Sequence, residues 1–151
     1  MRASLRPACW LALVAALLGT AACGPDPLAT IDLPLEFGPN TLPTSTYAVR
    51  VYVLPALVQG NTTVECEMFV GPTATERIYD YTSELVIAPQ LLQVDVDGDR
   101  AVMVKGLPEG LLVFVVEALD QSNTSLAWGC GKGQISRGQK TFISIFLEPD
   151  D

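Results

Sequence analysis

A nine-residue apolar segment at residues 111–119 dominates the C-terminal half of the chain, and Glu117 is its one polar position. Its branched and aromatic side chains favour a strand over a helix. A Gly-Leu-Pro-Glu-Gly turn precedes the segment and a polar Asp-Gln-Ser-Asn loop follows it, so its length is that of a strand. Because both faces are apolar, the pattern predicts a strand in the middle of a sheet.

Alternating apolar and polar positions predict the other strands of this sheet. They are expected at residues 47–54, 64–70, 91–96, 99–104, 126–130 and 139–147. In residues 64–70 the alternation points Cys66 toward the core. Residues 71–90 are irregular, and a short strand near 79–87 is compatible with a loop or one helical turn at 75–77.

The Asp97-Gly98 pair predicts a two-residue turn that joins residues 91–104 into a hairpin, with Asp95 opposite Arg100. The same acidic cluster also suggests a calcium loop. However, the calcium loop of EF-hands needs Gly at its sixth position and Glu at its twelfth. Those positions hold Arg100 and Gly106, so the turn is the favoured interpretation.

About seven strands in residues 46–151, without an amphipathic helix of ten residues, predict an all-β fold. The expected architecture is a single immunoglobulin-like antiparallel β-sandwich. The turn at 106–110, the strand that follows it, Cys130 and the last alternating strand are similar to the immunoglobulin-like or prealbumin-like sandwiches of bacterial surface lipoproteins. This resemblance covers residues 102–147 and implies a fold, without implying a chemistry.

The first 22 residues have the pattern of a secretory signal peptide. Arg2 and Arg6 precede an apolar stretch at 8–18, and small residues occupy 19–22. A transmembrane helix is the weaker interpretation, because the apolar stretch is shorter than the roughly 20 residues that span a bilayer.

Small residues just before Cys23 resemble the lipobox of bacterial lipoproteins, although Thr20 stands where the family usually has Leu. The resemblance implies cleavage before Cys23, lipid on that residue, and a lasting membrane anchor. Because Gly24 follows the Cys, it also implies the outer membrane rather than the inner one. The alternative is ordinary cleavage after Ala22, which would release a soluble protein.

Residues 23–45 contain five prolines and no helical period, which predicts an extended tether between the anchor and the domain. An alternative assigns residues 31–37 to the domain as an edge strand, where Pro34 would be tolerated.

Four cysteines are present in the chain. Cys9 is removed with the signal and Cys23 carries lipid, so Cys66 and Cys130 are expected to form a disulfide. On the chain-entropy description this bond would stabilise the fold by ~4 kcal/mol. A metal site is disfavoured, because the sequence has no His and no Cys-x-x-Cys spacing.

The lack of His excludes Ser-His-Asp and Cys-His catalysis and removes the commonest general base. Without Arg2 and Arg6, seven basic residues stand against 17 acidic ones, a net charge of −10. A surface this negative disfavours nucleic acid and anionic lipid headgroups as direct partners. We therefore expect no cofactor, no metal and no enzymatic activity.

Trp128, Tyr79 and Tyr81, together with Phe69, could form an exposed aromatic platform for sugar or peptide. The alternative is that these aromatic residues pack in the core. The predicted function is a non-catalytic structural or protein-interaction module of the bacterial envelope, with an envelope protein or polysaccharide as partner. Two alternatives are a small carbohydrate- or peptide-binding module and an enzyme or inhibitor with two facing carboxylates.

Overall fold

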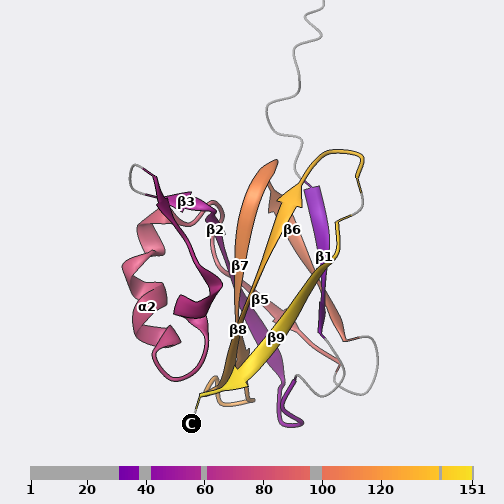
Figure 1. Cartoon of the computed structure of the whole chain (residues 1–151). Coiled ribbons are helices and arrows are strands. Elements are labelled where there is room, and N and C mark those ends of the chain that lie inside the picture. The colour runs from indigo at the N-terminus through magenta and orange to yellow at the C-terminus, as the bar shows by residue number, and fades with distance from the viewer. Residues whose placement is uncertain (1–30, 38–41, 59–60, 96–99, 140, 151) are drawn as a thin grey trace, which may run out of the picture.

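The computed structural model describes residues 31–37, 42–58, 61–95, 100–139 and 141–150. The fold is mostly β, as predicted, and seven strands form one mixed sheet that is nearly closed into a barrel (Figure 1). In spatial order they are β5 (Gln90–Gln93), β2 (Ala48–Pro55), β7 (Gly110–Leu119), β8 (Ser125–Ile135), β9 (Ile143–Pro149), β1 (Ile31–Phe37) and β6 (Ala101–Leu107).

The predicted central strand is confirmed as β7, which pairs along its length with β2 on one side and β8 on the other. Its two faces enter two different apolar clusters. Phe114 and Val116 belong to the cluster inside the barrel, whereas Val113 and Val115 belong to a second cluster on its outer face. Burial of both faces explains why nearly every position of this strand is apolar.

Residues 31–37 form β1, which lies between β9 and β6 inside the sheet. It runs antiparallel to β6 but parallel to β9, so the sheet is mixed rather than purely antiparallel. Pro34 is tolerated because it stands opposite Met103, while the ladder to β9 begins at Leu35. The structure therefore assigns residues 31–37 to the β-domain and not to the tether, and β1 is not an edge strand.

A covering segment, residues 56–58 and 61–85, packs over the outer face of β2, β7 and β8. It contains β3 (Leu57–Val58), β4 (Thr62–Thr63), the 3₁₀ helices η1 (Cys66–Phe69) and η2 (Thr82–Glu84), and the helix α2 (Ala74–Asp80). Figure 1 shows α2 beside the barrel rather than within it.

Two sequence predictions fail within the covering segment. The strand expected at 64–70 is wrong, because the chain turns as η1 and buries Phe69 against the outer face of the sheet. A seven-residue helix, α2, replaces the loop or single turn expected at 75–77, and it buries Ala74 and Ile78 one turn apart. Val86 donates one backbone hydrogen bond to Val53, but residues 85–87 form no strand.

The hairpin expected over 91–104 is also wrong in its pairing. Among the described residues, β5 pairs with β2 and β6 pairs with β1, so β5 and β6 form the two edges of the sheet. The Asp97-Gly98 turn lies outside the described residues. The Gln90 side-chain amide bridges these edges, donating to the Lys105 carbonyl at 2.6 Å and accepting from the Lys105 N–H at 3.1 Å. This bridge connects the two edge strands where no backbone ladder closes the barrel, and it occupies backbone groups that would otherwise be unpaired.

Three glycines on β8 explain how closely β9 approaches it. A Cβ atom at Gly131 or Gly133 would meet the side-chain ends of Ile143 or Ile145. A Cβ atom at Gly129 would collide with the backbone carbonyl oxygen of Phe146. The alternation of glycine with larger residues in β8 therefore leaves the interior space that the β9 isoleucines fill.

We expect Gly129→Ala to lower the free energy of unfolding by about 3 kcal/mol, because backbone atoms of β9 must move. Gly133→Ala should cost only about 1 kcal/mol, because the contacts at that site are with the side chains of Ile143 and Thr141 and not with backbone atoms. Urea unfolding of both variants measures the difference. Equal losses would contradict this account of the β8–β9 contact.

Candidate functional site

The structure does not bring the predicted aromatic platform together on the surface. Trp128 is 1% exposed and stacks on Tyr52 at 6.1 Å between ring centres, because the covering segment lies over this part of β8. Tyr79 is 70% exposed, whereas Tyr81 is half-buried, edge-on to the ring of the buried Phe69. The alternative, that most of these aromatic residues pack in a core, describes the structure better.

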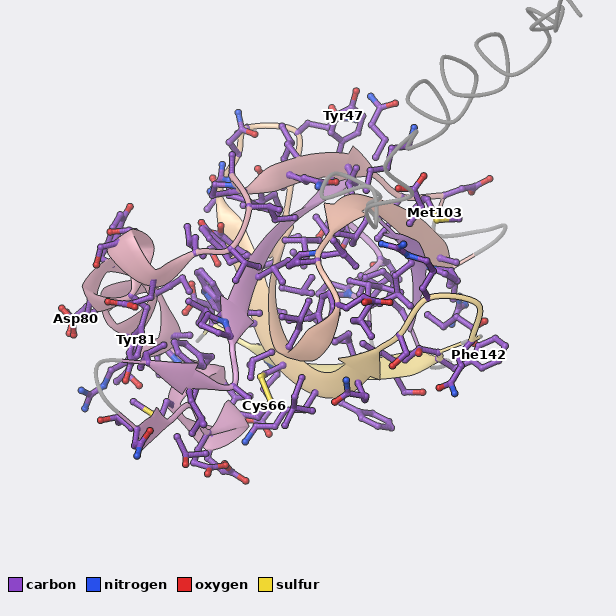
Figure 2. All side chains as sticks on the ribbon, turned by 90° about the horizontal axis from the view of Figure 1, so that it is seen from above. Tyr47, Cys66, Asp80, Tyr81, Met103 and Phe142 are labelled. Carbon is purple, nitrogen blue, oxygen red and sulfur yellow. A yellow bond between two sulfur atoms is a disulfide. The ribbon has the colours of Figure 1, made fainter. Side chains whose placement is uncertain are left out.

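Cys66 and Cys130 are joined by a disulfide, as predicted from the cysteine count. The bond connects η1 of the covering segment to β8 of the barrel, and it lies beside the labelled Cys66 in Figure 2. An exposed ion pair between Lys132 and Glu65, at 2.5 Å, spans the same two elements. The covering segment is therefore fastened to the sheet by a covalent bond as well as by apolar packing.

A pocket of about 300 Å³ lies at the end of the barrel where β1 begins and β8 ends. Four of its lining residues are apolar and four are polar. They are Leu33, Pro34, Ile135 and Phe142, and Asp32, Ser136, Gln139 and Thr141. Phe142 is 66% exposed, and Figure 2 shows it projecting outward on the opposite side of the molecule from Tyr81.

Local hydrogen bonds fix the polar part of this pocket. Asp32 accepts a bond from the backbone N–H of Gly106 at 3.3 Å, and the Thr141 hydroxyl donates to the carbonyl of Gln134 at 2.9 Å. Among the lining residues, Asp32 is the one carboxylate. A cavity that combines apolar walls with a few fixed polar groups is typical of a site for a small ligand or a single inserted side chain.

Sequence reasoning missed this pocket because it assigned the β1 residues to the tether. One signal was present: alternation in residues 139–147 puts Phe142 and Phe146 on the opposite face from Ile143 and Ile145. Both are strongly exposed in the structure. The missing element was β1, which supplies Asp32, Leu33 and Pro34 to the wall of the pocket.

A buried charge cluster lies elsewhere, on the outer face of β2 and β7. The Arg50 guanidinium donates to the Glu117 carboxylate at 2.7 Å, and the Tyr52 hydroxyl donates to it at 3.3 Å. Burial raises the pKa of Glu117 above its usual range, and the nearby Arg50 only partly offsets this. Burial likewise raises the pKa of Tyr52. Since Arg50 and Glu117 are directly opposite, the pair favours the observed register of these strands.

Neither site has the donors of a metal centre. Within the part of the chain that the structure describes, no group of three or more Asp, Glu, Cys or His side chains is arranged to hold a metal ion. No helix among those residues has the length and apolar character needed to cross a bilayer.

Comparison with models of known protein families found no match, and searches of curated proteins and of solved structures found none either.

Proposed function

We propose that the chain is an exported lipoprotein of the bacterial envelope. Lipid on Cys23 anchors it, in the outer membrane rather than the inner one. The observation that carries this proposal is the bond between Cys66 and Cys130, because disulfides persist in oxidising compartments outside the cytosol. The signal-like pattern of residues 1–22 and the small residues before Cys23 support the same conclusion.

The domain then acts as a non-catalytic interaction module, with an envelope protein or polysaccharide as its partner. The sequence contains no His, and the described pocket is lined by one carboxylate rather than two that face each other. The other notable carboxylate, Glu117, is buried and paired with Arg50. These features favour binding over hydrolysis.

Replacing Cys23 with Ser tests the anchor. We expect the variant to lose all metabolic lipid labelling and to accumulate as an unprocessed precursor or a soluble form, because Ser cannot accept the thioether-linked lipid. The measurement is fractionation combined with labelling by an acyl-chain probe. Thr20→Leu, which restores the usual residue of the lipobox, is the matched control and should keep the label. A Cys23→Ser variant labelled as strongly as the parent would refute the proposal.

A second candidate function is a small carbohydrate- or peptide-binding module. The pocket beside exposed Phe142 favours it, although the residues differ from the aromatic platform expected from the sequence. Capture of one partner from envelope extracts by the parent but not by Phe142→Ala would support this candidate. Equal capture by both would place the interaction elsewhere.

We also propose that the fold is distantly related to the immunoglobulin-like or prealbumin-like sandwiches. The β7–β8–β9 meander and a buried Trp128 near the disulfide support the relation. Two features differ from the antibody-domain pattern: the disulfide reaches η1 instead of a strand of a facing sheet, and the sheet is continuous around the barrel. A crystal structure in which the strands do not form two packed sheets would refute this relation.

A further inference from the structure

The strand directions define two ends of the barrel, and Figure 1 shows β1 starting at the upper one and the C-terminus near the lower one. The anchor pole comprises residues 31–34, 105–111, 134–139 and 141–142, which include the start of β1, the β6–β7 turn and the end of β8. The far pole comprises the ends of β1, β5, β7 and β9, the start of β6, and the described residues that adjoin them.

The chain length between the lipid-bearing residue and β1 is short. Ile31 follows Cys23 by only eight positions along the chain. Even a fully extended chain of that length spans no more than roughly 29 Å. Since β1 begins at the anchor pole, lipid on Cys23 keeps this pole close to the bilayer.

Charge is distributed unequally between the two poles. The described charged residues of the anchor pole balance: Asp32 and Glu109 against Lys105 and Arg137, with Arg137 and Glu109 forming an ion pair at 3.9 Å. The far pole is acidic. Its carboxylates are Glu36, Asp95, Asp120, Glu148 and Asp150, and its one described basic residue is Arg100. In a mature chain of net charge −10, the pole nearest the membrane is thus the one that headgroups repel least.

Apolar side chains are exposed at the same pole. Phe142 is 66% exposed beside the pocket, and Leu111 at the start of β7 is 49% exposed. Aromatic side chains are favoured at the boundary between headgroups and acyl chains, and affinity for that boundary increases with the apolar area buried there.

We propose that the anchor pole docks on a lipid surface, with Phe142 inserted among the acyl chains next to the headgroups. This inference rests on the proposed lipid anchor at Cys23, which supplies the attachment that one inserted side chain cannot. Docking fixes the orientation of the domain, and it leaves the acidic far pole and the covering segment exposed to the periplasm or medium for an envelope partner.

The test uses the full mature lipoprotein, isolated from membranes and reconstituted in phosphatidylcholine vesicles whose acyl chains carry bromine near the headgroup. Phe142→Trp places a fluorophore at the docking site. Phe146→Trp is the matched control, because Phe146 on β9 is equally exposed but lies four residues along the chain, about 13 Å farther from the anchor pole. Buried Trp128 contributes the same background to both variants.

We expect bromine to quench the added fluorescence of Phe142→Trp about twofold or more relative to unbrominated vesicles, and that of Phe146→Trp little. Equal quenching of the two variants, or none in either, while the protein carries lipid and floats with the vesicles, would overturn docking but leave the lipoprotein proposal standing. Protein that carries no lipid label and does not float would overturn both.

Discussion

Replacing both Cys66 and Cys130 with Ala is expected to lower the free energy of unfolding by about 4 kcal/mol. The bond closes a separation of 64 residues, so its loss releases a large amount of conformational freedom in the unfolded chain. The double variant is preferable to either single one, because it leaves no free thiol to form mixed disulfides. Urea unfolding without reductant measures the change against the parent.

The structure also predicts where the loss is concentrated. The bond fastens the covering segment to β8, whereas β7 is held by two full strand ladders. Amide hydrogen exchange should therefore accelerate in α2 before it does in β7. Glu65→Gln, which removes only the exposed ion pair to Lys132, serves as control and should cost less than about 1 kcal/mol. A double variant as stable as the parent would show that apolar packing alone holds the segment.

Replacing Arg50 with Met is expected to cost about 3 kcal/mol at pH 7, because the buried Glu117 carboxylate loses its charged partner. The loss should depend on pH. Burial already raises the folded-state pKa of Glu117 above its ordinary value of 4.5, so its contribution to stability is complete below that value and is lost as pH rises through the folded pKa. Removing Arg50 raises the folded-state pKa of Glu117 further, and the free energy of unfolding then falls more as the pH rises.

Urea unfolding of Arg50→Met and the parent at several values between pH 4 and pH 8 measures this effect. The two proteins should differ least at the acidic end, where the carboxyl is protonated, and most near neutrality. Glu117→Gln is the control for the titrating group, and in its background Arg50→Met should lose its pH dependence. A difference between parent and Arg50→Met that is constant across this pH range would exclude Glu117 as the cause.

The central strand and the disulfide were the features of the fold that the sequence predicted best. Residues 111–119 are apolar on both faces, and that pattern has few structural solutions besides a strand covered on both sides. The disulfide was predicted by counting, since removal of Cys9 with the expected signal and lipid on Cys23 would leave only Cys66 and Cys130 to pair. Glu117 was visible as the polar exception in the apolar run, but its partner on β2 depends on register, which one strand alone does not specify.

The covering segment and the pocket were not predictable, because both depend on which distant surface a segment packs against. Residues 64–70 alternate like a strand, yet their apolar side chains reach the outer face of the sheet from a 3₁₀ turn, and periodicity does not report which surface a segment covers. Residues 31–37 contain a proline, which suggested a tether or an edge. Their place inside the sheet depends on partners more than 60 residues away in β6 and β9.

The parallel ladder between β1 and β9 also determines when folding can finish. Leu35 is opposite Ile143, so residues near the two ends of the chain must meet before the sheet is complete. A polypeptide threaded across a membrane from its N-terminus cannot make this contact until its last strand has emerged. Loop closure over so long a separation is slow. On the proposed export route, the barrel would therefore stay incomplete until β9 had crossed the membrane.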